Sequence, residues 1–539
     1  RNGFPPDSDK EKAICKQLIA KLVEMDLIGL LGMLRHVPTP EVSDNEKDTL
    51  TCFATILTLS VIELLDVFKR HKTIDFPEVT LTAQRALGSE GMPSELALAL
   101  DYEIKHILID EFQDTSLAQY RFITHLISGW DDSDKNTFFA VGDPMQSVYR
   151  FRDADVSLFS QTFKGGFEQL PLESETLVSN FRSSSELVEY SNKIFSKLFS
   201  NPELKAFSGV NFSSSRATVD KPGMAQLVIC KNDSDQIFQA KLICDRIKLL
   251  RRTKPNDTIA LLARTRSVLA NIFIEMRNAG LTWNGIDIEP LSNIPVVRDL
   301  YALTRAIEEP NNRVAWLSVL RSPLVGLELR DLEIINALGS MQQITNAELS
   351  TQGKKRVSRL ENVLQKIDPY NSLRQRTETL WITLGGADAF PDENSLSNAY
   401  KYFDLLEKKY SEEQGLDRFF ELIANSYNSD TQSLADVQIM TVHKAKGLEF
   451  DHVLVIGAEK TTQIDRRPLL YWKQITDGLL MASRTQEQKP NLYEWLRLEQ
   501  KTEQSGEDIR LLYVAFTRAI SSISVYASHD SEIPPRGSF

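Results

Sequence analysis

Residues 104–115 read IKHILIDEFQDT and residues 437–457 read VQIMTVHKAKGLEFDHVLVIG. In both stretches a short apolar run ends in a polar loop, which is typical of a buried strand in a parallel sheet. The same pattern predicts strands at Ile104–Ile109, Thr137–Val141, Ala225–Cys230, Thr258–Ala263, Val437–Val442, His452–Ile456 and Ser522–Tyr526. Helical segments lie between many of these runs, for example from Leu117 to Ile127. This alternation predicts an α/β fold, with parallel sheets covered by helices on both faces.

Two regions depart from the alternation and are predicted to be helical. Residues 10–103 show apolar residues at helical spacing, as at Ile14, Leu18, Leu22 and Met25. Residues 310–430 contain few strand-like runs, and an apolar stripe recurs there at Leu396, Ala399, Phe403, Leu406 and Tyr410. Because strand-like runs resume at 437, we expect a helical domain inserted into the second α/β domain.

The composition is that of a globular protein with several apolar cores. The 539 residues predict roughly three to four domains. The content of 42% hydrophobic and 25% charged residues is ordinary for a soluble protein. A net charge of -12 argues against a protein that coats nucleic acid with its whole surface, although a local basic groove remains compatible with it.

Neither a metal-binding cysteine cluster nor a targeting segment is visible. The cysteines are scattered, at Cys15, Cys52, Cys230 and Cys244, which predicts four unpaired buried thiols in a reducing compartment. The apolar stretch from Phe53 to Phe68 contains Glu63 and Asp66 and is shorter than a membrane span requires. We therefore expect this stretch to be a buried helix and the chain to be cytoplasmic.

Two carboxylates, Asp110 and Glu111, follow the strand predicted at 104–109. In open α/β sheets, ligands bind beyond the carboxyl ends of the strands. Two carboxylates in that place suit a hydrated Mg²⁺ on nucleotide phosphates, and the second can orient or deprotonate a water molecule. A solvated strand end is the ordinary alternative for such a pair taken alone.

The next predicted strand leads into FFAVGDPMQSVYRFRDAD at residues 138–155. Gln146 can both donate and accept hydrogen bonds, so it can report the state of a nucleotide to the neighbouring segment. An exposed aromatic beside an arginine, as at Phe151 and Arg152, suits stacking on single-stranded bases, worth about 1–3 kcal/mol per base. The alternative is that Phe151 belongs to the core and Arg152 is an ordinary surface charge.

Two arginines lie in further distinctive stretches, SNFRSS at 179–184 and EDIRLLYVAFTRAISSISVYA at 507–527. Phe181 can stack on adenine, while the guanidinium of Arg182 suits a pair of phosphate oxygens. Arg518 lies near the end of a predicted helix and is a candidate arginine finger, a contribution worth about 10³–10⁵ in rate. Taken singly, each arginine would be assigned to the surface.

The loop between the two apolar runs of 437–457 is rich in cations. His443, Lys444 and Lys446 can meet a DNA backbone. Gly447 allows a close backbone approach, and Glu449 can accept a hydrogen bond from a ribose hydroxyl. A pair of solvated lysines is the alternative interpretation.

The order of these stretches is more specific than any one of them. DEFQDT, GDxxQSxYxFR, NFRS, TVHKAKGLEF and LLYVAFTRA follow one another across residues 104–520. This order resembles motifs II to VI of the superfamily 1 helicases of the UvrD/Rep type. The strings GDPMQSVYRFRDADVSLF, NFRSS and MTVHKAKGLEF are most similar to the RecB/AddA branch, the helicase–nuclease subunits that process double-strand ends.

The resemblance implies two RecA-like P-loop domains that sandwich ATP and Mg²⁺ and move single-stranded DNA, in that family from 3′ to 5′. It implies Mg²⁺ binding and water activation by Asp110 and Glu111, and γ-phosphate contacts by Gln146, Arg182 and Arg518. It further implies nucleotide contacts by Phe181, Arg182, Arg264, Gly447, Glu449 and Arg518. DNA contacts are implied for Tyr149, Phe151, Arg152, His443 and Lys446.

The resemblance also implies a division into domains. Residues 1–103 correspond to a helical part of domain 1 and residues 104–170 to the rest of a RecA-like domain 1A. Residues 171–309 and 431–539 correspond to domain 2A, interrupted by a helical 2B-like insertion at 310–430.

The sequence departs from the family pattern in two places. The phosphate-cradling loop G-x-x-x-x-G-K-[ST] is absent, because Gly353-Lys354 lacks the upstream glycine and lies in the helical insertion. With Arg1 as the first residue, this predicts that the first RecA-like domain is incomplete and that the chain alone hydrolyses ATP very poorly. Asp153 stands where the family usually has glycine after FR, which predicts an altered DNA-facing loop.

Two functional hypotheses follow. The first is an ATP-dependent DNA helicase of recombination and repair, possessing or lacking a nuclease domain. Its partners would be single-stranded or duplex-end DNA and a RecC/AddB-like subunit. The alternative is a non-catalytic helicase-fold scaffold or DNA-binding subunit, which the missing phosphate loop favours and the presence of Glu111, Gln146, Arg182 and Arg518 opposes.

Overall fold

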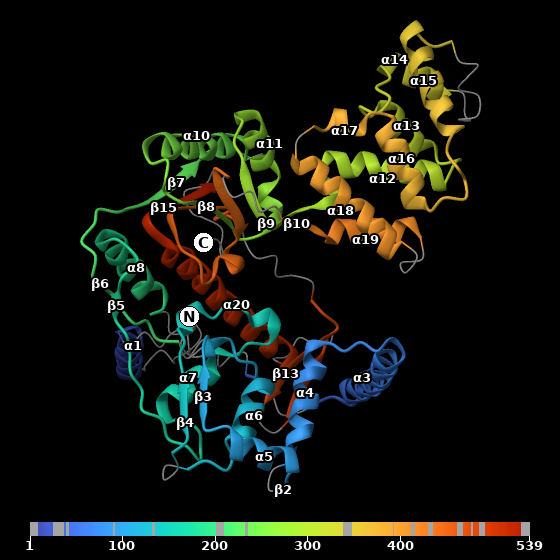
Figure 1. Ribbon diagram of the computed structural model, residues 1–539. Coiled ribbons are helices and arrows are strands. Elements are labelled where there is room, and N and C mark those ends of the chain that lie inside the picture. The colour runs from blue at the N-terminus through green and yellow to red at the C-terminus, as the bar shows by residue number, and fades with distance from the viewer. Residues whose placement is uncertain are drawn as a thin grey trace. The chain divides into compact units, whose positions relative to one another are not determined.

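The computed structural model describes residues 9–24, 37–38, 42–89, 92–131, 135–200, 210–231, 236–337, 348–391, 393–410, 415–429, 435–460, 467–475, 478–484 and 491–529. The chain forms two compact units (Figure 1). The first contains Arg1–Arg246, Lys254–Ile272 and Ala445–Phe539, and the second contains Ile247–Thr253 and Phe273–Lys444. Three separate stretches of the sequence therefore contribute to the first unit.

The described part of residues 9–103 is helical, as the apolar spacing predicts. It contains α1 (Asp9–Glu24), α3 (Asp44–His71), α4 (Phe76–Leu87) and α5 (Glu95–Glu103). Met25 of the predicted stripe lies outside the described residues. A two-residue antiparallel pair that the sequence did not predict, β1 (Gly88–Ser89) with β2 (Met92–Pro93), separates the last two helices.

Helix α3 corrects the predicted burial of the apolar stretch 53–68. The stretch was expected to be buried, yet no residue of α3 is buried, and Ile56, Leu59 and Ile62 are more than half exposed. Among the described elements, its main contact is with strand β14 (Gly478–Ser483). The apolar stretch is part of the 28-residue helix α3, in which an 18-residue portion has a mean hydropathy of 1.9. Among the described residues it is the one helix with the length and composition of a span, a property that core helices share.

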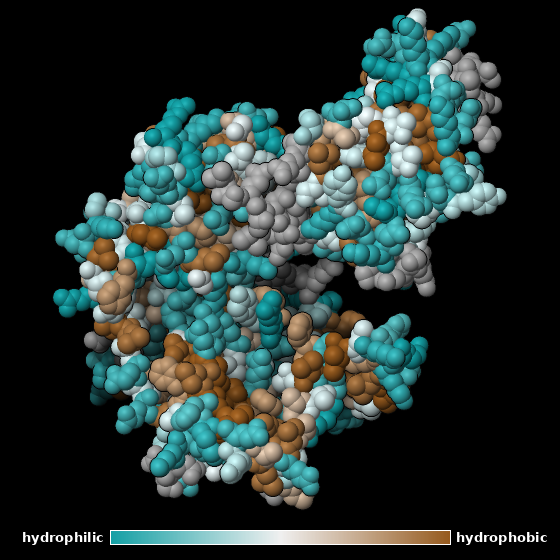
Figure 2. All heavy atoms as spheres, in the orientation of Figure 1, coloured by the Kyte–Doolittle hydropathy of each residue, from teal (hydrophilic) through white to brown (hydrophobic). Residues whose placement is uncertain are grey.

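The first predicted sheet region forms a parallel pair, β3 (His106–Ile109) with β4 (Thr137–Ala140). Helices α6 (Leu117–Leu126) and α7 (Val156–Gly165) accompany this pair. One face packs into a core built on Phe112, Ile127, Trp130, Phe167 and Leu170. On the other face the side chains of Leu108 and Phe139 are 74% and 60% exposed, and Figure 2 shows apolar side chains gathered over these strands.

A second parallel array forms the other main part of the first unit. Its strands run in the order β8 (Ile259–Ala263), β12 (Phe450–Ile456), β15 (Ala519–Ser528) and β7 (Met224–Cys230), all parallel. Strand β8 is fully buried, which explains its continuous apolar sequence. Each strand lies where an apolar run predicted it, so the α/β class is confirmed.

Several further elements complete the first unit. A short parallel pair, β5 (Ser179–Asn180) with β6 (Arg216–Ala217), flanks α8 (Ser185–Leu198). The sequence missed an antiparallel hairpin, β13 (Leu470–Ile475) with β14, that packs against the long helix α20 (Leu492–Thr517). Helix α10 (Ile237–Thr253) begins in this unit, and the described termini are α1 and β15.

The second unit is mainly helical, as predicted for residues 310–430. Strand β9 (Trp283–Pro290) pairs with β10 (Tyr427–Ser429) and β11 (Val437–Thr441). The helices are α11 (Ala270–Ala279), α12 (Pro295–Glu308), α13 (Arg313–Arg321), α14 (Leu329–Ala337), α15 (Thr351–Leu364), α16 (Leu373–Thr383), α17 (Gly386–Ala389), α18 (Glu393–Lys409) and α19 (Leu416–Asn425). The predicted stripe of α18 packs into their common core through Ala399, Phe403 and Leu406. Gly353 lies inside α15, so it belongs to a helix and not to a phosphate loop.

The cysteines match the prediction in part. All four are free, and Cys230 and Cys244 are buried. Cys52, on the exposed helix α3, is exposed, and Cys15 is partly exposed, so the prediction of four buried thiols was wrong for these two.

Candidate nucleotide and single-strand site

The carboxylates Asp110 and Glu111 lie where the sequence places them, at the carboxyl end of β3. Glu111 adopts φ 55° and ψ 38°, a left-handed conformation that non-glycine residues rarely adopt. The Glu111 N–H donates to Oδ1 of Asp110 over 2.9 Å, which holds the two residues in a tight turn. Strained backbone of this kind is concentrated at functional sites, because surrounding structure must hold it in place.

Gln113 connects this turn to the end of the neighbouring strand, a role that the sequence did not reveal. Its side chain is fully buried; Nε2 donates to Oε2 of Glu111 over 2.5 Å, and Oε1 accepts from the N–H of Asp143 over 3.0 Å. A Cβ at Gly142 would lie 2.3 Å from Oε1 of Gln113, so this approach requires glycine at 142. The string DEFQDT contained the residue, but its partner Asp143 lies 30 positions further along the chain.

The amino group of Lys446 reaches the same carboxylates. It lies 3.0 Å from Oε2 of Glu111 and also pairs with Asp114, and its side chain is 5% exposed. Burial would raise the pKa of Glu111, but hydrogen bonds from Lys446 and Gln113 outweigh it and hold that pKa below its usual value. The sequence assigned Lys446 to DNA, and such a contact would require this pairing to break.

Gln146 and Arg518 meet across 372 positions of sequence. Oε1 of Gln146 accepts from Nη2 of Arg518 over 2.9 Å, while its Nε2 donates to Oδ2 of Asp143 over 2.8 Å. Arg518 lies just after the last residue of α20, is 3% exposed, and also donates to the carbonyl oxygen of Leu448. Burial, together with the neighbouring charge of Arg182, lowers the pKa of Arg518 to about 10. Two guanidinium groups that repel one another would both be stabilised by a phosphate.

Arg182 occupies the edge of this cluster. Its Nε donates to Oε2 of Glu449 over 2.6 Å and its Nη1 to the carbonyl oxygen of Thr517 over 3.1 Å. Glu449, predicted to bind a ribose hydroxyl, is therefore held by Arg182 here, with its side chain 56% exposed. Phe181 is 77% exposed, which leaves its ring available for stacking.

The remaining predicted nucleotide contacts differ in accessibility. Gly447 has φ 81°, and a Cβ there would meet nothing within 4 Å, so the backbone lies open to a ligand. Arg264 is 6% exposed; it pairs with Asp508 of α20 and donates to the carbonyl oxygen of Lys460 over 3.0 Å. In this arrangement Arg264 supports α20 and does not face a ligand.

The segment predicted to contact DNA projects an aromatic and a cation. Phe151 is 66% exposed, and its ring lies edge-on to Tyr149 with centroids 5.8 Å apart. Cζ of Arg152 lies 5.1 Å from the Tyr149 ring centroid and 5.5 Å from that of Phe151. His443 and Lys444 lie on a single turn, Val442–Ala445, with His443 half-buried and Lys444 exposed.

Two family models match the chain. The model of the UvrD/REP helicase N-terminal domain matches residues 40–165, and that of the UvrD-like helicase C-terminal domain matches residues 176–528. The chain belongs to the UvrD-like helicase family. The predicted RecA-like P-loop fold is thereby confirmed.

Among relatives, this UvrD-like chain is similar to proteins named as subunits of an ATP-dependent helicase/nuclease. It is 25% identical over 521 residues to the one of Lactobacillus acidophilus, covering 86% of this chain and 42% of the relative. With the Clostridium acetobutylicum protein it shares 25% identity over 601 residues, covering 97% of this chain and 48% of the relative. With the Exiguobacterium sibiricum protein it shares 27% identity over 531 residues, covering 84% of this chain and 42% of the relative. The chain thus spans under half the length of these relatives, and the predicted resemblance to the RecB/AddA branch is confirmed.

The carboxylates of this UvrD-like chain suit a hydrated Mg²⁺ that arrives with a nucleotide. Asp110 and Glu111 are both exposed at the strand end and offer only oxygen ligands, which Mg²⁺ prefers. Within the described ranges no three His, Cys, Asp or Glu side chains gather as a dedicated metal centre would require. Two carboxylates plus water and phosphate oxygens are the usual ligands of a nucleotide-borne Mg²⁺.

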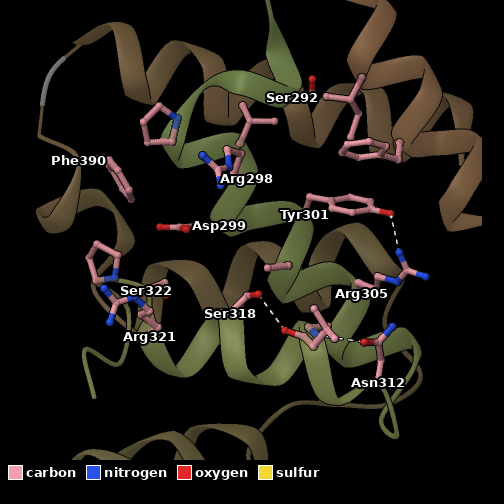
Figure 3. Close-up of a pocket in the computed structure, with 18 residues that line it drawn as sticks. Ser292, Arg298, Asp299, Tyr301, Arg305, Asn312, Ser318, Arg321, Ser322 and Phe390 are labelled. Carbon is pink, nitrogen blue, oxygen red and sulfur yellow. Dashed lines mark hydrogen bonds between the residues drawn. The ribbon is translucent and has the colours of Figure 1, made fainter. Parts of the chain in front are cut away.

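The helical unit contains a separate cavity of about 880 Å³ (Figure 3). Arg298, Asp299 and Arg321 line it together with aromatic residues, among them Tyr301 and Phe390. Burial raises the pKa of Asp299 to about 6, against a weaker opposing effect of Arg298. No residue of the predicted site lines this cavity.

Proposed function

We propose that the chain is the motor part of an ATP-driven translocase that unwinds DNA in recombination and repair. The observation that carries the proposal is the continuous hydrogen-bonded path Glu111–Gln113–Asp143–Gln146–Arg518. It links the candidate base to the candidate arginine finger across the sequence. A path of this kind suits a site in which loss of a phosphate is transmitted to a neighbouring strand-binding loop.

In the proposed cycle Asp110 and Glu111 would hold Mg²⁺, which would offset negative charge on the phosphates, and Glu111 accepts the proton of the attacking water. Its low pKa keeps it ionised at neutral pH, as a base requires. Arg182 and Arg518 neutralise charge on the transferred phosphoryl group. The exposed ring of Phe181 stacks on adenine, and Glu449 exchanges Arg182 for a ribose hydroxyl.

On the DNA side, Phe151 and Arg152 contact the single strand, with Tyr149 in support. His443 contributes a further contact to the DNA backbone, and so does Lys446 once it leaves Glu111. We propose movement from 3′ to 5′. We also propose a partner subunit, because the relatives are themselves named as subunits of a helicase/nuclease. The substrate is duplex ends or single-stranded DNA in the cytoplasm.

Because the sequence contains no G-x-x-x-x-G-K-[ST] loop, we propose that this chain alone hydrolyses ATP very slowly. Backbone amides and a lysine in such a loop normally hold the β- and γ-phosphates. The same absence favours the second candidate, a helicase-fold scaffold that binds DNA without an ATP cycle.

The two candidates are separated by single-strand-stimulated ATP hydrolysis. It is measured for this chain, for the full gene product, and for the full gene product carrying Arg518→Ala or Lys241→Ala. Lys241 is an exposed cation of α10 and serves as the control for loss of one positive charge. Turnover by the full product that Arg518→Ala reduces about 10³-fold or more, while Lys241→Ala does not, supports the motor. If the proteins bind single-stranded DNA but none of them hydrolyses ATP, the scaffold is supported.

A further inference from the structure

Helix α20 (Leu492–Thr517) and Arg518, which follows it, hold the segment 146–150 at three successive points. Beyond the contact of Arg518 with Gln146, Nε of Arg510 donates to the carbonyl oxygen of Ser147 over 2.6 Å. Further along, Oε1 of Glu507 accepts from the N–H of Arg150 over 3.2 Å. The segment that directly precedes the proposed DNA contacts Phe151 and Arg152 is therefore attached to the C-terminal half of α20.

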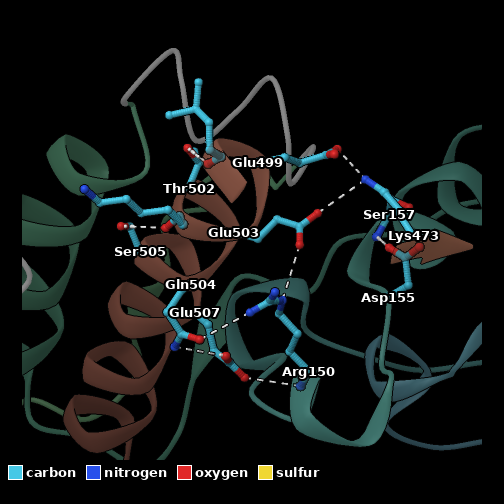
Figure 4. Close-up of polar contacts among 12 residues, drawn as sticks. Arg150, Asp155, Ser157, Lys473, Glu499, Thr502, Glu503, Gln504, Ser505 and Glu507 are labelled. Atoms are coloured by element: carbon cyan, nitrogen blue, oxygen red, sulfur yellow. Dashed lines mark hydrogen bonds and ion pairs between the residues drawn. The ribbon is translucent and has the colours of Figure 1, made fainter. Parts of the chain in front are cut away.

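The side chain of Arg150 faces α20 and not the strand-binding side. Its Nε donates to Oε2 of Glu503 over 3.3 Å and its Nη1 to Oε1 of Gln504 over 3.2 Å (Figure 4). Arg150–Arg152 form one turn of a 3-10 helix, in which successive side chains point about 120° apart. With Arg150 fixed on α20, the next two side chains project elsewhere, and both Phe151 and Arg152 are exposed.

The acidic residues involved form a row on one face of α20. Glu499, Glu503 and Glu507 are spaced four residues apart, so they lie one above another along the helix. Glu503 is shared: its second oxygen, Oε1, lies 3.5 Å from Nζ of Lys473 on the hairpin β13–β14. Lys473 also pairs with Glu499, one turn further along the row. The hairpin thus holds Glu503 through the oxygen that Arg150 does not use.

We propose that Arg150 and Glu503 are positioning residues for single-strand binding. Glu503 of α20 holds the Arg150 side chain and so directs Phe151 and Arg152 outward, toward the bases of the strand. The inference rests on the proposed contact of Phe151 and Arg152 with DNA. Beyond that contact, we infer that Arg150 and Glu503 set the affinity of the chain for single-stranded DNA without touching the DNA themselves.

The sign of the effect of Glu503→Gln tests the proposal. Removing a negative charge near a DNA site should strengthen binding if only long-range attraction matters. Positioning predicts the opposite, because Arg150 loses its ion pair with Glu503 and then holds the adjacent stacking aromatic less firmly. Glu499→Gln is the matched control, since it removes the same charge from the same helix face but leaves Arg150 held by Glu503.

The measurement is the affinity of the full chain for a fluorescein-labelled oligo(dT), by anisotropy, with thermal unfolding of each variant as a check on folding. We expect Glu503→Gln and Arg150→Ala each to weaken binding about five- to tenfold. The variant that carries both substitutions should bind as tightly as either single variant, because both break the same contact. Glu499→Gln should bind as tightly as the unaltered chain. The swapped pair Arg150→Glu with Glu503→Arg should recover most of the affinity, which a general folding defect would not allow.

Three outcomes overturn the proposal. If Glu503→Gln binds as tightly as Glu499→Gln or more tightly, the acidic row does not position the segment. If Arg150→Ala alone weakens binding and lowers the salt dependence by one phosphate contact, Arg150 touches DNA directly. If the unaltered chain binds no oligonucleotide, the proposed function fails first, and this inference with it.

Discussion

Asp153 follows the strand-binding turn with φ 62° and ψ 21°, in the left-handed region. The family to which the chain belongs usually has glycine there, and glycine adopts this conformation without steric cost. Aspartate is among the few other residues that tolerate it. The loop therefore keeps the backbone shape that glycine would give, which argues against the expectation that Asp153 alters it.

From this conformation we predict different effects for two substitutions at 153. Asp153→Gly should change the free energy of unfolding by less than about 1 kcal/mol, whereas Asp153→Val should lower it by about 1–2 kcal/mol, because a β-branched side chain clashes in this region. Urea denaturation of the purified variants measures both. Equal stability of the valine and glycine variants would mean that the turn does not hold the left-handed conformation in solution.

Asp299 in the cavity of the helical unit gives a prediction that depends on pH. Burial raises its pKa from an ordinary value of 3.8 to about 6, so the folded unit prefers the protonated acid. The stability that protonation contributes is complete below about pH 4 and is lost as the pH rises through about 6. Asp299→Asn should therefore stabilise the chain at about pH 7.5 by about 1–2 kcal/mol, after allowance for the group's partial exposure, and have little effect at about pH 4.

The measured quantity is the difference between the asparagine variant and the unaltered chain at each pH, obtained by thermal unfolding. Other titrating groups contribute to both proteins and cancel in that difference. Asp388→Asn, on an element that does not line the cavity, provides a control of the same chemistry. A difference that stays constant between these two pH values would show that Asp299 titrates normally.

At the scale of whole elements, the solvent exposure of helix α3 can be tested through its cysteine. Cys52 lies on this helix and is exposed, while Cys230 and Cys244 are 2% and 3% exposed in other parts of the unit. We predict that iodoacetamide modifies Cys52 under native conditions at least about tenfold faster than either buried thiol. Peptide mass spectrometry identifies the modified residue, and Cys52→Ser should remove the fast phase. A slow reaction at Cys52 would mean that another surface covers α3 in solution.

The elements that the sequence predicted correctly share one property, which is that their own residue pattern reflects their burial. Strand β8 is apolar throughout because both of its faces are buried. The hairpin β13–β14 was missed because much of it stays exposed, including Trp472 at 68%, so its sequence does not read as a buried strand. The burial of α3 was predicted wrongly because apolar composition alone does not say which surface, if any, packs on a helix.

In the candidate site too, some residues could be predicted from local sequence and others could not. The carboxylates after β3 could be predicted from a strand ending in acidic residues, and Arg518 from a helix ending before a strand. The partners of Gln113, Lys446 and Arg150 could not, since they depend on contacts between residues up to 357 positions apart. Such pairings arise from the fold, and no local pattern encodes them.

At the scale of the whole molecule, the net charge of -12 limits how the chain can bind DNA. A surface that is acidic on average repels phosphates, so attraction must come from the few cations of the proposed strand-binding segments, such as Arg152 and Lys444. Each phosphate contact on a single strand contributes about -0.7 to the slope of log affinity against log salt concentration. With about two to four such contacts, we predict a slope between about -1.5 and -3 for oligo(dT).

Arg152→Ala should make that slope shallower by about 0.7 and weaken binding at all salt concentrations, since it removes one contact and a stacking partner of Tyr149. Lys241→Ala, on the exposed face of α10, should leave the slope unchanged. A slope steeper than about -5 would contradict the prediction, because it would require more cationic contacts than the proposed segments supply. Binding would then extend over surface that the acidic composition argues against, and the strand would have to follow a path other than the one marked by Phe151.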